Sequence, residues 1–377
     1  MKKNILLLTL LLGISIILLI TANAFDRADR PDAPPPVSDR TPHIEISMSD
    51  ENVSLAGAPI EDWITWKTDT VELYNRYRPL GRIYFARSVA IQWGVFDIPD
   101  GSFIRKQYFD LSTDKSFRDA RRYNMRSGER SIELQNLMVD SEYFFRITLE
   151  LENNQGCIAE GSFSTKWSPR ILEFENLRNI RDVGGWKTAD GKSVKQGLLY
   201  RGCELDGATE ENYKITPVGK DIMLDDLKIK SEFDLRPKLA NARDALGETV
   251  THRYFNLPSY AGCFTDNGNQ KLADVFAAMA DEKNYPIYLH CTEGSDRTGI
   301  VCYLLGALLG MSEEDCYRDW ELSLLATGSA KYEQMDRFVE TLHRVDGDTL
   351  QEKTENYLLS IGVTRTQIEN IRAILVG

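Results

Sequence analysis

The sequence predicts an α/β domain, in which helices cover a sheet, preceded by a small all-β sandwich domain. Three features of the chain lead to this prediction. From about residue 172 onward, short apolar runs alternate with longer runs of helical character. Between residues 43 and 168, β-rich runs are separated by polar turns. A Pro-rich stretch at residues 25–42 cannot bury a core, so we interpret it as an extended linker ahead of the folded part.

The N-terminus has the features of an export signal. Lys2 and Lys3 precede an apolar run from Ile5 to Ile20, and the small residues Ala22-Asn23-Ala24 follow it. This pattern predicts a signal peptide over residues 1–24 and an exported protein that is secreted, periplasmic or on the cell surface. An uncleaved anchor is the alternative, and it is the only membrane contact that we expect.

Composition narrows the classes of partner. The net charge of −12 argues against nucleic acid as a main partner. The six cysteines include no Cys-x-x-Cys pair, and no cluster with metal-ligand spacing occurs along the chain. We therefore expect no metal and no cofactor. A length of 377 residues is enough for two domains.

The first predicted domain spans residues 43–168. Its candidate strands are residues 43–49, 83–96, 131–137, 143–151 and 158–165. The pattern of Leu137, then residues 141–147, then residues 161–165 resembles the end of a fibronectin type III-like sandwich. This resemblance implies a spacer or an adhesion module, and we take the spacer as the default.

The second predicted domain spans residues 169–377 and alternates between strands and helices. Its candidate strands are residues 171–177, 198–201, 230–235, 253–257 and 286–290. Its candidate helices are residues 221–227, 271–281, 298–309, 313–325, 331–345, 349–359 and 364–375. Such alternation predicts a parallel or mixed sheet, and ligands of these sheets bind beyond the carboxyl ends of the strands.

Residues 286–299, Pro-Ile-Tyr-Leu-His-Cys-Thr-Glu-Gly-Ser-Asp-Arg-Thr-Gly, indicate the chemistry of this domain. A short apolar run ends at Cys291, and Arg297 and Thr298 precede a long apolar helical run. A loop between a strand and a helix start presents backbone N–H groups to an anion. The same field favours a thiolate at Cys291, and the fork of Arg297 matches two phosphate oxygens. The pattern therefore predicts a sulfur nucleophile directed at phosphorus.

The segment from His290 to Gly299 resembles the signature loop of the cysteine-dependent tyrosine and dual-specificity phosphatases, HCxxGxxRTG. Further segments are similar to the bacterial secreted tyrosine-protein phosphatase branch of that superfamily. These segments are residues 179–185, 197–202, 233–236 and 361–371. The resemblance covers about residues 172–377 and implies a tyrosine/dual-specificity phosphatase-like sheet covered by helices.

The resemblance implies a role for each residue of the loop. Cys291 would form a phosphocysteine, while Arg297 and the N–H groups of Thr292, Glu293, Gly294 and Ser295 would hold the phosphoryl oxygens. Thr298 would donate to the sulfur as it departs, with a helix-start role as the alternative. We expect a structural role for His290.

A set of arginines before the loop forms a local basic group. Arg201 and Arg236 follow predicted strand ends, and with Arg178 and Arg181 they are expected to bind or steer an anionic substrate. Pairing with nearby acids is the alternative for each of them.

The proton donor is not fixed by the sequence. Relatives usually place an Asp on a loop roughly thirty residues before the Cys, but Leu257–Gly262 contains no carboxylate. Asp296 and Asp234 are equal candidates, and Asp266 is a distant third.

Three functions stay open at this point. The first is a metal-independent phosphatase of the protein-tyrosine phosphatase type, acting on phosphotyrosine peptides or small phosphomonoesters. The second is an inositol-phosphate, phytate or phosphoinositide phosphatase, which is weakened because many members of the branch carry Lys where this chain has Ser295. The third is a phosphate-binding module without turnover, which the missing loop acid allows.

Overall fold

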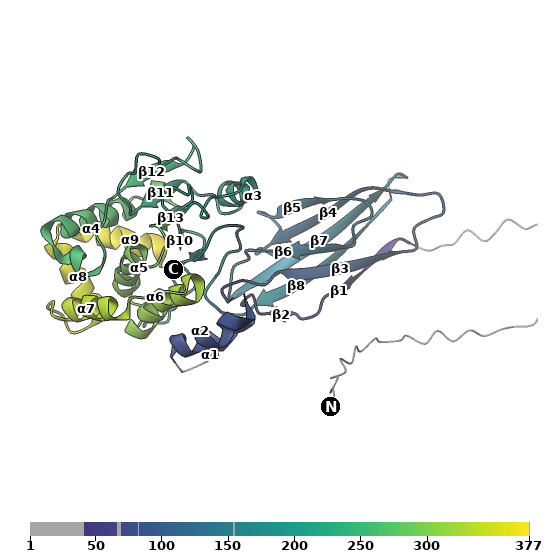
Figure 1. The fold of residues 1–377 in the computed structure, drawn as a ribbon. Helices are drawn as coiled ribbons and strands as arrows, with labels where there is room; N and C mark the ends of the chain where they lie inside the picture. Colours follow the sequence, from purple (N-terminus) through teal and green to yellow (C-terminus); the bar gives the residue numbers. More distant parts are fainter. Residues whose placement is uncertain (1–40, 66–68, 82, 154, 377) are drawn as a thin grey trace, which may run out of the picture. The chain divides into compact units, whose positions relative to one another are not determined.

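The computed structural model describes residues 41–65, 69–81, 83–153 and 155–376, which form a mixed α/β fold (Figure 1). The predicted signal peptide and nearly all of the predicted linker lie outside these residues. Within the described ranges, no helix is long and apolar enough to cross a membrane.

Two sheets occupy most of residues 43–165. The first has the order β1-β3-β6 and consists of His43–Ser47, Val89–Phe96 and Ser131–Leu134. The second has the order β2-β8-β7-β4-β5 and consists of Asn52–Val53, Gly156–Thr165, Ser141–Leu151, Ile104–Ser112 and Arg121–Met125. Alternate residues of β7 are buried, as expected for a strand with one core face. Phe109 stacks on Phe145 at a ring-centroid distance of 5.5 Å, and Trp93 lies 6.2 Å from Phe109. The resemblance to a fibronectin type III domain stays a prediction.

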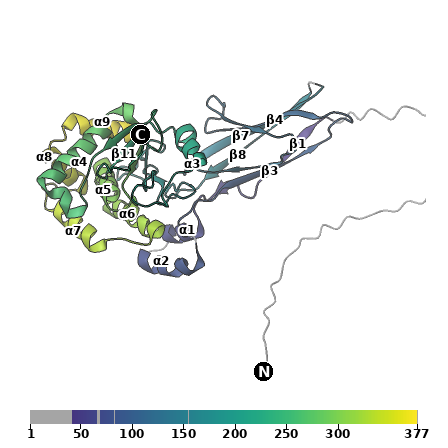
Figure 2. The ribbon, with the colours of Figure 1, turned by 45° about the horizontal axis from the view of Figure 1, so that its top comes forward.

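The expectation that residues 43–168 are all-β misses two helices, α1 (Ala58–Thr65) and α2 (Thr70–Tyr77), and a 3₁₀ turn, η1 (Arg78–Leu80). Helix α1 buries Ile60 and Trp63, and α2 buries Leu73. These side chains join the core of the C-terminal domain rather than that of the two sheets. Figure 2 shows both helices beside α6 (Glu313–Thr327).

Two contacts hold these helices on α6. Arg318 lies over the Trp63 ring at 4.3 Å and donates to Trp63 O at 2.7 Å. Thr70 Oγ1 donates to Glu321 Oε2 at 2.6 Å. The apolar residues of α1 and α2 therefore serve a partner that is distant in sequence, which explains why the local pattern was misread.

The C-terminal sheet has the order β12-β11-β13-β10-β9. Its strands are Thr251–Tyr254, Ser231–Asp234, Ile287–His290, Leu199–Gly202 and Arg181–Asp182. Strands β10 to β13 pair in parallel, and β9 is antiparallel to β10. The predicted strand over residues 171–177 is wrong, because that segment makes only an isolated bridge from Ile171 to Arg181.

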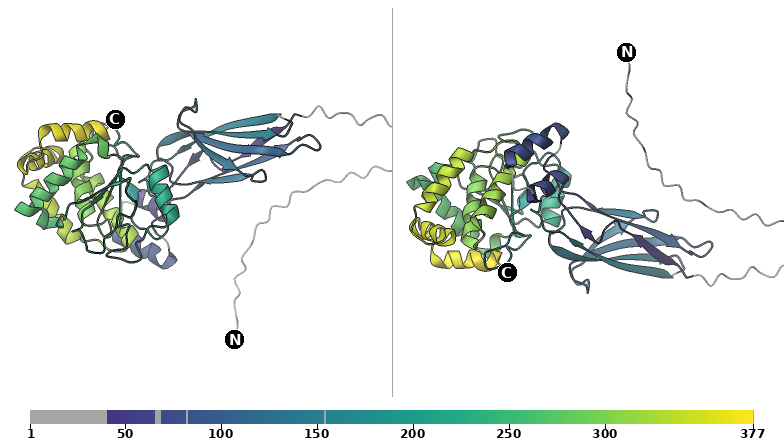
Figure 3. Two further views of the ribbon diagram at one scale, coloured as in Figure 1. Left: turned by 90° about the horizontal axis from the view of Figure 1, so that it is seen from above. Right: turned by 90° about the horizontal axis from the view of Figure 1, so that it is seen from below.

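The remaining helices follow the sequence pattern closely. After α6 come α7 (Tyr332–His343), α8 (Leu350–Ser360) and α9 (Arg365–Leu375), while α4 (Asp266–Met279) and α5 (Arg297–Leu309) precede it. The predicted helix over residues 221–227 is instead a short α3 (Pro217–Asp221) followed by one turn of π-helix, η2 (Ile222–Asp226). Both views in Figure 3 show the yellow C-terminal helices beside the green ones.

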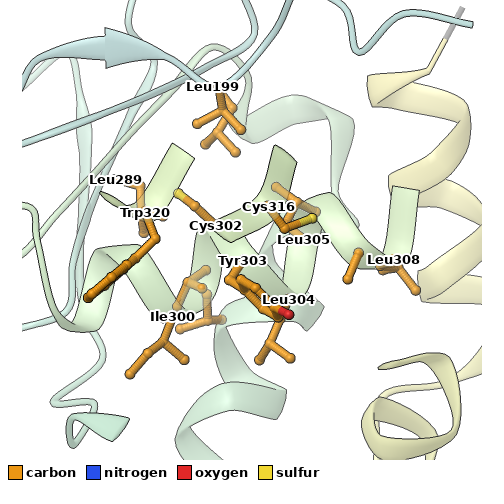
Figure 4. Close-up of a cluster of buried hydrophobic side chains, with 14 of the residues drawn as sticks. Leu199, Leu289, Ile300, Cys302, Tyr303, Leu304, Leu305, Leu308, Cys316 and Trp320 are labelled. Carbon is orange, nitrogen blue, oxygen red and sulfur yellow. The ribbon is translucent and has the colours of Figure 1, made fainter. Parts of the chain in front are cut away.

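Helix α5 is the centre of the domain core and is buried on nearly every side. Figure 4 shows Leu304, Leu305 and Leu308 of α5 among the buried side chains of the surrounding elements. Those neighbours include Leu199 and Leu289 from the sheet and Cys316 and Trp320 from α6. Because α5 cannot shift within this packing, its N-terminus is a rigid platform for the preceding loop.

Candidate active site

A six-residue turn, here called the Cys291 loop (residues 291–296), joins the end of β13 to the start of α5. Strand β13 lies between β10 and β11, so the loop leaves the carboxyl end of the strand at the middle of the sheet. This is the edge at which open parallel sheets bind ligands. The Cys291 residue is 2% exposed.

The N-terminus of α5 faces the loop without a side-chain cap. Asp296 holds the N-cap position but makes no capping hydrogen bond. Its carboxylate instead accepts from Tyr260 Oη at 2.8 Å and from Lys331 Nζ. The first N–H groups of α5 are therefore left to an anion in the loop, where the helix dipole adds to the attraction.

The surroundings of Cys291 favour a thiolate. Burial on its own would raise the pKa of the Cys291 thiol. The Arg297 charge, the Thr298 hydroxyl and the N–H groups of Thr298 and Gly294 outweigh burial, so the pKa is lowered. The Thr298 hydroxyl is buried and makes no other well-formed hydrogen bond within the described residues. A lowered thiol pKa is what a nucleophilic cysteine needs.

Gly294 shapes the turn. Its φ is +71°, in the left-handed region, and a Cβ there would lie 2.3 Å from Gly202 O. Both the backbone angle and the close approach require glycine. Arg201 Nη2 donates to Gly294 O at 2.8 Å, and Glu204 N donates to Thr292 O at 3.0 Å. The loop carbonyls thus point outward to partners, which leaves its N–H groups for the interior.

A buried ionic brace supports the loop from α6. Asp319 accepts from Arg181 Nε at 2.9 Å and from Arg201 Nη1 at 2.5 Å. Asn179 links the brace to the loop, because it donates to Glu293 O at 3.0 Å and accepts from Arg181. The two guanidinium groups outweigh burial and lower the pKa of Asp319.

A comparison with family models then decides the assignment. The model described as the tyrosine phosphatase family matches residues 172–377, which is more than half of the chain. The chain belongs to the tyrosine phosphatase family. The matched region includes the residues of the brace and all of the residues that form the Cys291 loop.

Two curated members of this group are similar to the chain. A provisionally named tyrosine-protein phosphatase of Cupriavidus necator is 25% identical over 165 residues, which cover 38% of this chain and 59% of the relative. A tyrosine-protein phosphatase of Nostoc commune is 23% identical over 146 residues, which cover 38% of this chain and 46% of the relative. The matches therefore span between 46% and 59% of those relatives' length.

Solved structures of one protein also align with part of the chain. The core catalytic domain of the PP-IP phosphatase SIW14 from S. cerevisiae, in complex with citrate, is 14% identical, with a TM-score of 0.29. The alignment covers 38% of this chain and 83% of that one. A second structure of the Siw14 catalytic core is 15% identical, with a TM-score of 0.29, and the coverages are 43% and 93%.

Two arginines predicted to bind substrate in this family member are engaged elsewhere. Arg201 is 0% exposed and lies behind the loop, between Gly294 O and Asp319. Arg236 is 2% exposed and pairs with Asp234, Glu204 and Asp206. The expectation that they contact the substrate is therefore wrong, and the alternative, pairing with nearby acids, describes both. Arg201 is a positioning residue for the loop.

The two candidate acids are now separated. Asp234 is fully buried, and both of its carboxylate oxygens accept from Arg236. It is unavailable to a substrate, which corrects its place as an equal candidate. Asp296 lies in the Cys291 loop with its side chain 24% exposed. Asp266 is exposed at the start of α4.

The loop also has a cationic rim, of which the sequence suggested Arg178 but not Lys331. Lys331 precedes α7, is 48% exposed at its side chain, and pairs with Asp296. Arg178 is exposed and lines a cavity of about 780 Å³ that also borders Asn179. Lys331 thus brings an ammonium group to the loop even though position 295 is a serine. Arg297 Nη2 donates to Thr292 Oγ1 at 3.3 Å.

His290 is fully buried behind Cys291. Its Nδ1 lies 3.1 Å from Cys291 O and its Nε2 lies 3.0 Å from Glu232 Oε1. Burial opposes the charged ring, but Asp234 and Glu232 outweigh it and raise the pKa of His290 to about 9. The geometry fits the predicted structural role, since both ring nitrogens have acceptors.

Proposed function

We propose that this chain is a phosphomonoester hydrolase that acts through a phosphocysteine at Cys291. The observation that carries the proposal is the lowered pKa of a buried thiol at the uncapped N-terminus of α5, with Arg297 six residues away in sequence. Membership of the tyrosine phosphatase family supports the same class of reaction.

In the first step, Cys291 Sγ attacks phosphorus, so that a P–S bond forms and the P–O bond to the leaving group breaks. Backbone N–H groups of the Cys291 loop and the Arg297 guanidinium hold the equatorial oxygens. The leaving oxygen takes a proton from Asp296, a loop carboxyl group whose side chain is 24% exposed.

In the second step, water attacks the phosphocysteine and loses a proton to the Asp296 carboxylate. A P–O bond forms, the P–S bond breaks, and inorganic phosphate leaves. The Thr298 hydroxyl is placed to donate to the departing thiolate, because it has no other well-formed partner among the described residues. No step in this sequence requires a metal.

The test compares phosphate release from a phosphotyrosine peptide and from inositol hexakisphosphate. The intact chain should release phosphate, and Cys291→Ser should release none while it still binds the phosphopeptide. Cys157→Ser serves as a control, since Cys157 lies on β8 of the other domain's sheet. A chelator should leave the rate unchanged. Failure of the intact chain to act on either compound would leave only a phosphate-binding module.

Asp296→Asn tests the proton donor. In the first turnover, the substitution should slow release of phenol from phenyl phosphate by about 100-fold or more, but should barely affect release of p-nitrophenol from p-nitrophenyl phosphate, whose leaving group needs little protonation. Equal losses on both substrates would show that Asp296 acts in another way. Lys331→Ala removes the ion pair but keeps the Asp296 carboxyl group, so its rates show how much of the Asp296→Asn effect comes from the lost pair.

A second candidate function, hydrolysis of inositol phosphates, is favoured by the rim cations. Lys331 and Arg178 both act electrostatically on Glu293 of the loop, so a polyanion at the loop would contact more than one positive group. Lys331→Ala and Arg178→Ala should then lower kcat/KM for inositol hexakisphosphate far more than for the phosphotyrosine peptide. A uniform effect would favour phosphotyrosine, which is our main proposal.

We also propose export, because the N-terminal segment has the features of a signal peptide. A tagged chain expressed in a bacterium should be recovered outside the cytoplasm as a species shortened by about 24 residues. Recovery at full length in the membrane fraction would indicate the anchor instead.

A further inference from the structure

Two histidines and two carboxylates gather on one face of the central sheet, next to the Cys291 loop. They are Glu232, Asp234, His252 and His290. We infer that Glu232, His252 and His290 bind one divalent transition-metal ion of the zinc class, beside the Asp234 carboxylate that Arg236 holds and at a site separate from the phosphate chemistry of Cys291.

The sheet register creates the cluster. Glu232 of β11 is paired with His252 of β12, and Asp234 of β11 is paired with His290 of β13. Paired residues on neighbouring strands point to the same face, and so do residues two apart on one strand. The four side chains therefore converge although they span three strands, and no local ligand spacing in the sequence reveals them.

His252 is arranged as a ligand. Its side chain is 6% exposed, and its Nδ1 lies 2.9 Å from Asp244 Oδ1. A carboxylate at Nδ1 holds the proton there, so Nε2 carries the lone pair. That Nε2 is buried, has no hydrogen-bond partner in the described residues and lies 3.8 Å from Asp234 Oδ2. An orphaned, buried ring nitrogen beside a carboxylate is what a metal would satisfy.

His290 has the matching arrangement. Its Nδ1 is held by Cys291 O at 3.1 Å, which leaves Nε2 directed at Glu232 Oε1 at 3.0 Å and near Asp234 Oδ2 at 3.9 Å. One ligand atom from each of Glu232, His252 and His290 lies within 4.8 Å of the others. Ligand atoms around tetrahedral zinc are roughly 3.3 Å apart. Small side-chain rotations would therefore close the site.

Charge and donor type select the ion. Arg236 pairs with Glu204, Asp206 and Asp234 and so neutralises one of several buried carboxylates. A divalent cation would balance the remaining excess, replacing the proton that His290 and Glu232 share. A mixed imidazole and carboxylate set favours zinc, cobalt or nickel over magnesium or calcium, which take oxygen ligands.

The test uses the full-length Cys291→Ser chain, because the thiolate itself would bind zinc. Competition against a chromophoric chelator should show one bound zinc per chain. His252→Gln in this background should weaken zinc binding more than about 100-fold, and Asp244→Asn should weaken it about 10- to 100-fold. His343→Gln is the matched control, since His343 Nε2 lies 2.7 Å from Glu313 Oε1 on the surface, and it should change nothing.

Cobalt supplies a second readout. Bound Co²⁺ should show visible bands of a low-coordinate nitrogen and oxygen site without a thiolate charge-transfer band. The inference is overturned if the Cys291→Ser chain binds no zinc, if cobalt shows thiolate ligation, or if a folded His252→Gln chain binds as tightly as its parent. Circular dichroism verifies folding. Asp244, which is 66% exposed at its side chain, gives the deciding variant if His252→Gln unfolds.

Discussion

Arg201 donates to Gly294 O from one end of its guanidinium group and pairs with Asp319 from the other, at 2.8 Å and 2.5 Å. The turn that presents the nucleophile is thus tied through one side chain to α6. The contact does not involve the substrate. It orients the loop carbonyl outward and therefore keeps the adjoining N–H groups directed at the phosphate position.

Arg201→Lys tests this relationship. Lysine keeps the charge but cannot bridge Gly294 O and Asp319 with a planar fork. Because loss of loop geometry acts on the transition state, kcat should fall by about 100-fold while KM changes little. Steady-state hydrolysis of p-nitrophenyl phosphate measures both constants. Arg178→Lys, on the exposed rim, is the control, and an unchanged kcat in Arg201→Lys would contradict the role.

Gly294→Ala should destabilise the loop for two reasons, and Gly191→Ala separates them. Gly191 has φ +83° but open space around a Cβ, whereas Gly294 adds a contact of 2.3 Å with the Gly202 backbone. The left-handed angle alone costs about 1–2 kcal/mol. We expect that loss for Gly191→Ala, and a larger loss plus inactivity for Gly294→Ala. Equal urea midpoints for the two variants would refute the steric account.

Asp319→Asn should remove the centre of the brace. Breaking a buried pair while its partner cations remain costs about 3–5 kcal/mol. Because its folded pKa is lowered, the Asp319 contribution is fully present above the unfolded pKa and is lost as pH falls through the folded value. The gap in unfolding free energy should therefore be widest near neutral pH and shrink in acid. Urea titrations at neutral pH and in acid measure the difference in unfolding free energy between the two chains. Asp274→Asn, at an exposed site, is the control.

Alkylation should reveal the Cys291 thiolate directly. Its lowered pKa predicts rapid reaction with iodoacetamide at pH values well below the usual thiol range. Cys157 is the internal control, because burial raises its pKa and it should react only at higher pH. Peptide mass mapping assigns each modified residue. In Thr298→Val the Cys291 profile should move to higher pH, and an unshifted profile would exclude the hydroxyl as a thiolate donor.

The sequence predicted the C-terminal helices and the loop well for physical reasons. Runs such as residues 298–309 are long and continuously apolar, so their type was unambiguous, and α5 was found within one residue. The short strand β9 was missed, because two consecutive buried residues are too few to show the alternation of buried and exposed side chains that marks a strand. The turn of π-helix, η2, was likewise beyond a pattern based on 3.6 residues per turn.

The site was predicted in its local part only. Cys291, Arg297 and Thr298 are contiguous with their loop and were found, whereas Asp319 reaches it from α6 and Lys331 from the position before α7. Such contacts depend on tertiary packing that no spacing encodes. The expected roles of Arg201 and Arg236 were wrong for the same reason, since their burial and pairing cannot be read from charge alone.

Helices α1 and α2 supply part of the hydrophobic core of the C-terminal domain. Ile60, Trp63 and Leu73 fill its core, although the family match begins only at residue 172. A fragment cut at that point would expose to water the apolar surface that these side chains cover, so we expect it to be less stable than the full chain. The preceding hundred residues therefore do more than connect the domain to the N-terminus. A fusion that transfers this domain to another protein should include them.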